Sequence, residues 1–210
     1  MARANPIDKH DVRRRALVDS ALRTLGELGY AKSSLREIAN NSPFSHGVVH
    51  YYFQNKVELI VYCVKQYKAV CVTRYDGVVA DSTTAAGLVV AFANKLCETI
   101  VDEAPMHRLW YDLRAQSMFE EYLREAAHQI DRSLEEMTWR VVTRYADLAG
   151  TETALSPLTV YGMLDGVFQQ ALLDYLSGQE QEALGILREQ VSELMPLTLR
   201  STPTDAPGVA

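Results

Sequence analysis

Residues 33–60 read SSLREIANNSPFSHGVVHYYFQNKVELI, and this stretch contains most of the signals that decide the fold. Ser34 and Glu37 have the spacing of a capping box, which predicts the start of a short helix. The expected buried residues of that helix are Leu35, Ile38 and Ala39. Because Pro43 disfavours a helical conformation for the residue before it, the helix should end near Asn41.

A second short helix is expected over residues 46–53, with Ser45 as its N-cap. Val49 and Phe53 lie four positions apart, so they can pack with Phe44 against the preceding helix. That packing leaves five residues facing outward: His46, Gly47, Val48, His50 and Tyr51. Glycine costs a helix about 1 kcal/mol of propensity. A contact with another molecule therefore explains Gly47 better than folding does.

The residues before this stretch form a third helical pattern and carry an excess of positive charge. Apolar residues recur at helical spacing over residues 9–28, and Gly29 supplies an end signal. Residues 1–56 contain nine lysines and arginines against five acidic residues, a net charge of +4, whereas the remaining residues contain 12 against 22, a net charge of −10. Three short helices with concentrated positive charge are typical of a helix-turn-helix module, which places the second helix of its pair in the major groove of DNA. A solvated helix face is the plainer interpretation of the charge alone.

The rest of the chain also shows helical periodicity, without the sustained alternation that β-strands require. Further helices are expected over residues 55–80, 84–102, 106–117, 119–149, 157–177 and 180–199. We therefore predict an all-α protein of about nine helices. Its expected parts are a helix-turn-helix domain at 1–55, a helical bundle at 56–200 and a disordered tail at 201–210.

Composition and motifs argue against several other classes of protein. The charged first residues lack the apolar centre of a signal peptide and the run GLVVAFA is too short to span a bilayer, so we expect a cytoplasmic protein with no membrane partner. Cys63, Cys71 and Cys97 form no CxxC pair and are expected to pack as small apolar side chains. His46 and His50 have the spacing of a metal-binding pair but no third ligand nearby, so neither a metal site nor a cofactor is expected. The sequence has no phosphate loop, HExxH motif or nucleophile elbow, which argues against an enzyme.

Residues 12–60 resemble the helix-turn-helix of the tetracycline-repressor (TetR) family. The likeness rests on the quoted stretch, with its capped helix containing Ile-Ala, its turn, the glycine in the second helix and the aromatic cluster before a lysine. The segments RLWYDLRAQSM and LDGVFQQALL resemble the regulatory domain of the BetI-like subgroup. The resemblance implies an N-terminal DNA-binding domain, followed by a bundle that binds a small molecule and forms the dimer.

The resemblance also assigns roles to individual positions. It implies DNA-binding roles for Ser34, Arg36, Ser45, His46, Gly47, Val48, His50, Tyr51, Tyr52 and Lys56. Ser34 and Lys56 are expected to hold phosphates, which sets register and affinity. The residues expected at the bases and the adjoining backbone, where sequence is read, are Arg36, His46, Gly47, Val48 and Tyr51. His50 and Tyr52 occupy the two ring positions of the family's aromatic signature. Each position has a plainer alternative: Arg36 as a solvated helix residue, for example, and Tyr52 as a brace of the core.

Two residues depart from the family pattern. Pro43 stands where the family has a turn glycine, and proline cannot adopt a positive φ. If the turn needs a left-handed residue, Asn40 or Asn41 is the natural substitute. The prediction is a rerouted turn with the following helix still in place. His50 replaces the usual tyrosine. Because imidazole gains charge as pH falls, the hypothesis is that DNA affinity rises from about pH 7.5 to 6.

Two sets of residues in the bundle are candidates for the roles that the resemblance implies. The candidate ligand-pocket residues combine aromatic surface with a few polar groups: Tyr67, Trp110, Tyr111, Arg114, Met118, Tyr145 and Gln169. The candidate residues of a two-fold dimer interface come from the last two helices: Gly162, Gly166, Leu173, Leu187 and Val191. Each residue of both sets could instead belong to the core of a single chain.

The sequence as a whole predicts a ligand-responsive transcriptional regulator. The leading hypothesis is a homodimeric repressor that binds a palindromic operator of double-stranded DNA and is released by a small-molecule effector. An enzyme is the competitor from another class, and the motifs argue against it. The remaining alternative is a helical small-molecule carrier or interaction protein that has lost operator binding, for which Pro43 would be the reason.

Overall fold

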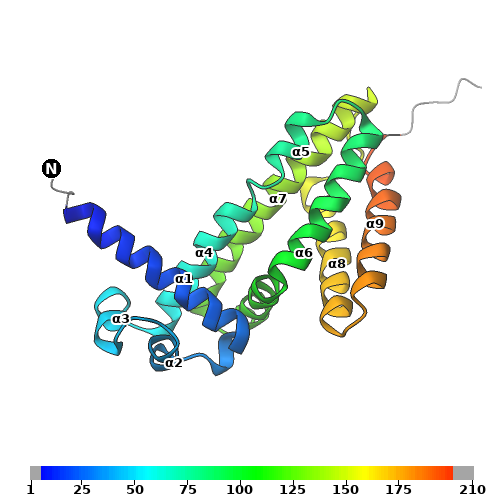
Figure 1. Ribbon diagram of the computed structural model, residues 1–210. Coiled ribbons are helices and arrows are strands. Elements are labelled where there is room, and N and C mark those ends of the chain that lie inside the picture. Colours follow the sequence, from blue (N-terminus) through cyan, green and yellow to red (C-terminus); the bar gives the residue numbers. More distant parts are fainter. Residues whose placement is uncertain (1–5, 201–210) are drawn as a thin grey trace, which may run out of the picture. The chain divides into compact units, whose positions relative to one another are not determined.

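The computed structural model describes residues 6–200, with side chains described from Val12 onward, and it is built from helices (Figure 1). The helices are α1 (Pro6–Lys32), α2 (Leu35–Asn40), α3 (His46–Tyr52), α4 (Lys56–Cys71), α5 (Asp76–Asp81), α6 (Ala85–Gln116), α7 (Glu121–Ala149), α8 (Pro157–Leu176) and α9 (Glu180–Leu197). Extended backbone pairs within residues 6–200 only at an isolated bridge between Thr153 and Leu199. The prediction of an all-α protein with about nine helices is confirmed. The expected tail at 201–210 lies outside the described residues.

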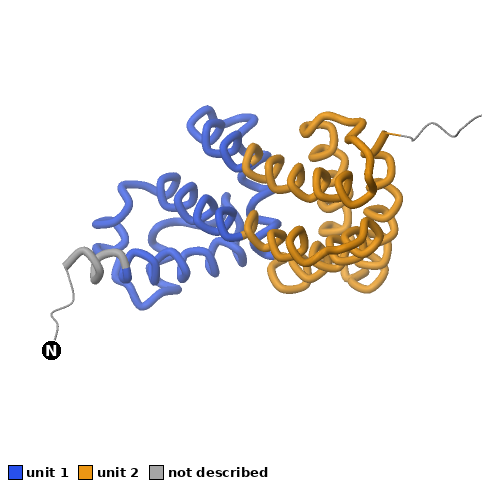
Figure 2. Tube along the Cα trace, turned by 90° about the horizontal axis from the view of Figure 1, so that it is seen from above, with its two compact units in different colours: residues 1–70, 105–130 blue, residues 71–104, 131–210 orange. Residues whose placement is uncertain are grey.

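Contacts divide the chain into two compact units (Figure 2). Unit 1 comprises Met1–Val70 and Pro105–Ile130, and unit 2 comprises Cys71–Ala104 and Asp131–Ala210. The helices α6 and α7 therefore contribute one part to each unit. The boundaries of these units differ from those of the domains expected at 1–55 and 56–200. The expected domains therefore stay a prediction about function.

The end of α1 is interrupted where the sequence predicts it. Gly29 has a φ of 77° and a ψ of 175°, which is not helical, although helical hydrogen bonding continues to Lys32. A positive φ of this kind favours glycine because a side chain would clash with the backbone. The expected end signal is thus confirmed, and three more residues follow it before the helix ends.

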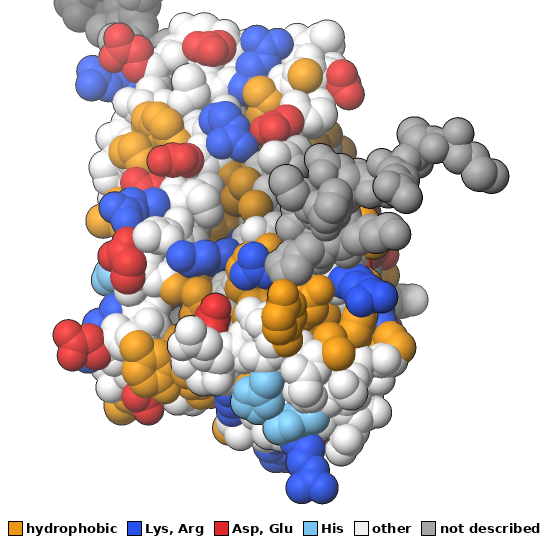
Figure 3. All heavy atoms as spheres, turned by 90° about the vertical axis from the view of Figure 1, so that its left-hand side faces the viewer, with side chains coloured by type: hydrophobic (Ala, Val, Ile, Leu, Met, Phe, Trp, Pro, Cys, Tyr) orange, Lys and Arg blue, Asp and Glu red, His pale blue; other side chains and the backbone are white. Residues whose placement is uncertain are grey.

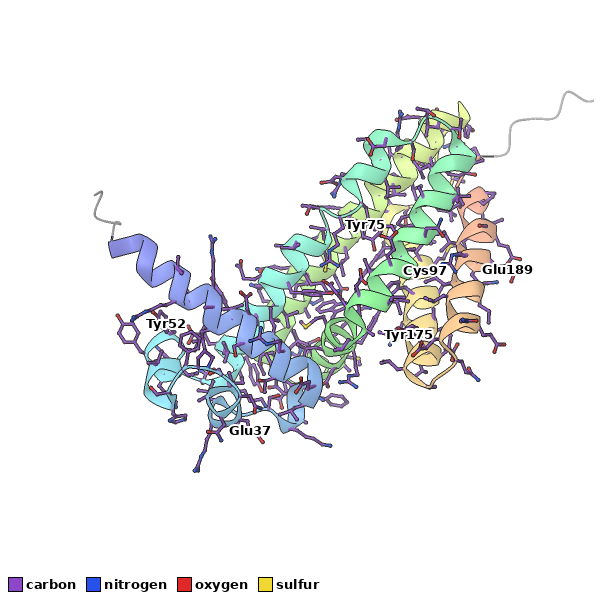
Figure 4. The ribbon with its side chains drawn as sticks, viewed as in Figure 1. Glu37, Tyr52, Tyr75, Cys97, Tyr175 and Glu189 are labelled. Carbon is purple, nitrogen blue, oxygen red and sulfur yellow. The ribbon has the colours of Figure 1, made fainter. Side chains whose placement is uncertain are left out.

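The single helix expected over residues 55–80 is wrong, because the structure divides it into α4 and α5. Between them, the Arg74 N–H donates to the Cys71 carbonyl at 3.2 Å, a bond that spans three residues as in a tight turn. The Tyr75 ring, labelled in Figure 4, is buried with its centre 5.5 Å from that of Phe92 on α6. Helical spacing within residues 55–80 does not predict this turn. The packing that accompanies it joins Tyr75 to Phe92, which lies on another helix.

The helices expected at 84–102 and 106–117 form one hydrogen-bonded run, α6, with a break inside it. Glu103 has a φ of −141° and a ψ of 26°, which is not helical. Pro105 follows two residues later, and it lacks an N–H and crowds the preceding turn. The predicted interruption is therefore confirmed in the backbone, close to the point where α6 passes from unit 2 to unit 1.

In unit 2, α8 and α9 pack against each other. The helix α8 begins as predicted, with Pro157 in its first turn and Ser156 Oγ accepting a hydrogen bond from the Thr159 N–H at 3.2 Å. Leu187 and Val191 on α9 have no exposed surface. Their expected place in a dimer interface is therefore corrected: both side chains belong to the core of one chain.

Crossing a bilayer requires a long and strongly apolar helix. Within residues 6–200, no helix has both the length and the apolar character needed to cross a membrane.

Candidate nucleic-acid interface

The first helix of the pair, α2, begins at the predicted cap. The Glu37 N–H donates to Ser34 Oγ at 3.1 Å, and Figure 4 labels Glu37 in this first turn. Leu35 and Ile38 are buried as expected, while Arg36 is exposed. The helix therefore turns its apolar side to the core of unit 1 and leaves a guanidinium available to a ligand.

The turn between α2 and α3 is rerouted as predicted, and α3 follows it in place. Asn41 has a φ of −93°, and no non-glycine residue of the described chain has a positive φ, so the turn needs no left-handed residue and neither Asn40 nor Asn41 supplies one. Instead, Ser42 Oγ accepts a hydrogen bond from the Phe44 N–H at 3.1 Å and donates one to the Ala39 carbonyl at 3.1 Å. A turn stabilised by a side chain needs no positive φ, which explains how proline fits at position 43.

The helix α3 rests on a small buried anchor. Its first turn is capped by Ser45, whose Oγ accepts a hydrogen bond from the Val48 N–H at 3.4 Å. Val49 and Phe53 are fully buried, as predicted, and Phe44 is half-buried. The anchor fixes which side of this seven-residue helix faces outward.

The outward side of α3 presents rings and a bare stretch of backbone. His46, Gly47, His50 and Tyr51 are exposed, whereas Val48 is half-buried. The imidazole rings of His46 and His50 meet edge to face with their centres 4.4 Å apart. Figure 3 shows imidazole side chains lying together on this face, close to hydrophobic and basic side chains.

An open depression of about 940 Å³ lies beside α3 and is shared with α1. Its lining consists of Arg13, Pro43, Phe44, Ser45, Gly47, Val48, Tyr51 and Tyr52. Tyr52, labelled in Figure 4, is half-buried, and Arg13 is exposed. No sequence motif singles out Arg13, which brings a cation from α1 to the same surface as the residues of α3.

Arg14 is a second residue that sequence reasoning missed. Its guanidinium carbon lies 4.1 Å from the ring centre of Tyr62 on α4 and 5.4 Å from that of Phe53. Cation–π contacts of this kind stabilise folded proteins by about 0.5–2 kcal/mol. Three consecutive arginines, Arg13, Arg14 and Arg15, indicate positive charge in the sequence, but only the aromatic partners decide which of them packs inward.

Lys56, expected to hold a phosphate, is half-buried at the start of α4. Its ammonium lies 4.4 Å from the centre of the Tyr30 ring and donates a hydrogen bond to the Ala31 carbonyl at 3.4 Å. Partial burial lowers the pKa of this ammonium, and the carboxylates of Asp112 and Glu37 act in the opposite direction. The lysine is therefore already ordered against the protein.

The candidate ligand-pocket residues are divided between the two units. In unit 1, Tyr67 and Trp110 are buried, Tyr111 and Arg114 are half-buried, and Met118 is 70% exposed. In unit 2, Tyr145 is buried and Gln169 is exposed. The assignment of these residues to a pocket stays a prediction.

The structure adds two polar side chains, Lys68 and His107, near the rings of Tyr67 and Trp110 in unit 1. Lys68 is only 3% exposed, and its ammonium lies 5.5 Å from the ring centres of both Tyr67 and Trp110. The His107 ring centre lies 6.1 Å from that of Tyr67. The indole N–H of Trp110 is buried with no hydrogen-bond partner in the described chain. In the sequence, Lys68 interrupts an apolar stripe, which is the only sign of its burial.

A metal ion would need several ligating side chains gathered around one point. Within residues 12–200, no three histidine, cysteine, aspartate or glutamate side chains form a group that could hold a metal ion. The interaction that the structure shows between His46 and His50 is the edge-to-face contact of their rings.

Known proteins resemble this chain in sequence and in fold. Residues 17–63 match the family described as bacterial regulatory proteins, tetR family, and this range contains the capped α2, its turn and α3. This N-terminal region belongs to the TetR family. The match ends within α4, so it includes the positions of both Tyr30 and Lys56.

Curated relatives resemble the chain over different lengths. The HTH-type transcriptional regulator BetI of Burkholderia thailandensis is 28% identical over 127 residues, which make up 59% of this chain and 64% of the relative, so the match spans slightly less than two thirds of that relative. The protein of the same name from Burkholderia mallei is 24% identical over 188 residues, or 88% of this chain and 94% of the relative. Both relatives are named as transcriptional regulators, and neither as an enzyme.

Solved structures share the fold of this chain at low sequence identity. The transcriptional regulator FadR of Bacillus subtilis, solved in complex with stearoyl-CoA, has a TM-score of 0.71 and 18% identity and covers 86% of this chain and 96% of its own. A transcriptional regulator of Saccharomonospora viridis, solved in complex with choline, has a TM-score of 0.73 and 14% identity and covers 91% of this chain and 100% of its own.

Proposed function

We propose that this protein is a TetR-family regulator, and that it is a homodimeric repressor that binds a palindromic operator and is released by a small-molecule effector. One observation carries the DNA-binding part: α3 exposes His46, Gly47, His50 and Tyr51 above an anchor that is fully buried. A short, exposed helix of this kind fits the major groove, where base edges differ between base pairs. The positive balance of residues 1–56 supports attraction to a polyanion. Regulation of genes implies a cytoplasmic location.

The outer face of α8 supports the homodimer. Leu158 and Leu173 are 67% and 57% exposed, and Gly162 and Gly166 are exposed between them. These four positions are separated by four, four and seven residues, so they share one face of the helix. A second copy related by a two-fold axis would cover this face and hold two α3 helices for the two halves of a palindrome.

The surroundings of Trp110 support a small-molecule site. A buried indole N–H without a partner costs about 1–3 kcal/mol, a cost that a ligand with a hydrogen-bond acceptor would remove. Aromatic rings and the ammonium of Lys68 lie close by, which suits an organic molecule with an acceptor group. Stearoyl-CoA and choline bound to two proteins of the same fold support ligand binding as a property of this architecture.

The salt dependence of DNA binding tests the proposal against the carrier alternative. We expect binding to the DNA upstream of the protein's own gene to weaken steeply between about 50 and 200 mM salt, because each lysine or arginine on a phosphate contributes about 0.9 to the logarithmic slope. Fluorescence anisotropy with a labelled duplex measures both affinity and slope. Absence of binding at low salt would favour a carrier that does not use DNA.

A charge-matched pair of variants locates the binding surface. Arg36→Gln removes an exposed cation from α2 and is expected to weaken DNA binding, whereas Arg200→Gln removes an exposed cation from unit 2 and should leave it unchanged. Equal losses in both variants would mean that overall charge, and not the proposed interface, determines the affinity.

The exposed imidazole of His50 predicts a pH-dependent affinity for DNA. Histidine changes its charge between about pH 8 and 5, and a protonated ring on the DNA-facing side of α3 attracts phosphate more strongly than a neutral one. We therefore expect the affinity to rise as the pH falls from about 7.5 to 6. His50→Tyr should flatten this profile when anisotropy titrations are repeated across the pH range. His46 is exposed on the same face, so His46→Gln serves as the comparison, and an unchanged profile in His50→Tyr would remove His50 as the cause.

A further inference from the structure

Tyr30 is held in place at both of its ends within unit 1. It follows the non-helical Gly29, and its N–H donates to Asp112 Oδ2 on α6 at 2.7 Å. At the other end, its hydroxyl lies 3.0 Å from the hydroxyl of Tyr122 on α7. A carboxylate acceptor makes the first of these bonds a strong one. The backbone of Tyr30 is therefore held by α6, and its ring is held through the hydroxyl by α7.

The same face of α6 also holds the helix that leads to Tyr30. Arg108 lies one turn before Asp112, and its guanidinium donates hydrogen bonds to the carbonyls of Gly26 and Glu27 near the end of α1. A cation suits the carbonyl end of a helix. A Cβ on Gly26 would lie 3.2 Å from the Cβ of Pro105, which shows how closely the two helices approach. Two charged side chains of α6 thus fix the backbone on both sides of the break in α1.

The fixed ring lies directly beneath the ammonium of Lys56. The distance of 4.4 Å from the Nζ atom to the ring centre is within the range of cation–π contacts. The described hydrogen bond to the Ala31 carbonyl uses one of the three N–H donors of the ammonium. The other donors can bind phosphate while the ring still supports the charge.

We propose that Tyr30 is a positioning residue for DNA binding: its ring, fixed by Asp112 and Tyr122, orders Lys56 for contact with a phosphate. This inference rests on the proposed DNA-binding function and adds a residue that does not touch DNA itself. Ordering a long side chain before binding removes an entropic cost that the complex would otherwise carry. Since the contact is to phosphate, the effect should be the same for every DNA sequence.

A double-mutant cycle on the full-length protein tests the inference with a random-sequence DNA duplex at low salt. Tyr30→Leu removes the ring and is expected to weaken binding by about 2- to 10-fold. Lys56→Met should weaken binding and lower the salt slope by about 0.9 for each lysine that contacts phosphate. In the Lys56→Met background, Tyr30→Leu should have no further effect. Tyr30→Phe keeps the ring under Lys56 and should bind within about twofold of the original protein.

Two results would overturn the inference while leaving the proposed function intact. One is an equal loss from Tyr30→Leu with and without Lys56, which would mean a general structural role; the other is no loss at all. If Tyr30→Leu lowers the melting temperature too far, Asp112→Ala replaces it in the same cycle, because it releases the Tyr30 backbone and keeps the ring. Failure of the unaltered protein to bind any duplex would instead contradict the proposed function.

Discussion

Phe53→Ala should lower the free energy of unfolding of unit 1 by about 3–5 kcal/mol, the cost of removing a buried phenylalanine ring. The ring is fully buried at the end of α3, with its centre 5.6 Å from that of Tyr62. The guanidinium of Arg14 lies 5.4 Å above the same ring, so the substitution also removes a cation–π contact. Urea unfolding at fixed protein concentration measures the loss.

Phe44→Ala is the matched control for this prediction. It removes the same side chain nine positions earlier, at a site that is half-buried instead of fully buried. Its cost should be clearly smaller, because less apolar area returns to water. Equal losses from the two variants, or a loss below about 1 kcal/mol from Phe53→Ala, would contradict the role of Phe53 as the anchor of α3.

Gly47→Ala should raise stability and weaken DNA binding. An added Cβ would meet its nearest neighbour, Ser45 Oγ, at 4.0 Å, so the fold has room for it. Alanine should stabilise the helix by about 0.5–1 kcal/mol relative to glycine. The same methyl would project from the exposed side of α3, where a close contact with DNA would be overpacked at a cost of about 1–3 kcal/mol, or roughly 5- to 150-fold in affinity.

Gly77→Ala is the control for the prediction that Gly47→Ala raises stability but lowers DNA affinity. Gly77 is an exposed helical glycine in α5 with the same clearance of 4.0 Å, to Asp81 Oδ2. It should gain stability by a similar amount without a change in DNA affinity, and urea unfolding together with anisotropy measures both quantities. A Gly47→Ala variant that binds DNA as tightly as the original protein would show that the backbone at Gly47 does not approach DNA.

Local signals in the sequence were sufficient wherever the deciding interaction lies within a few residues. The caps at Ser34, Ser45 and Ser156 and the break at Gly29 were predicted and are present, because each depends on a hydrogen bond or a φ angle in its own turn. The buried positions of α2 and α3 follow from helical spacing for the same reason. The exposed face of the candidate interface could therefore be predicted largely from short-range sequence patterns.

The predictions that failed concern residues whose partners are distant in the chain. The division of 55–80 into two helices accompanies the packing of Tyr75 on Phe92, and the burial of Leu187 follows from the packing of α8 against α9. Spacing along one helix cannot show which neighbour will cover it.

By itself, the sequence determined an all-helical chain with a basic, helix-turn-helix head, because capping, helical periodicity and charge are properties of short segments. Only the tertiary structure decided that Arg14 packs between aromatic rings and that Tyr30 supports Lys56. It also decided that Asp112, 82 residues after Tyr30, holds the backbone there. These contacts depend on the positions of separate helices in space, and their energies arise only once packing brings charges and rings within a few ångströms of each other.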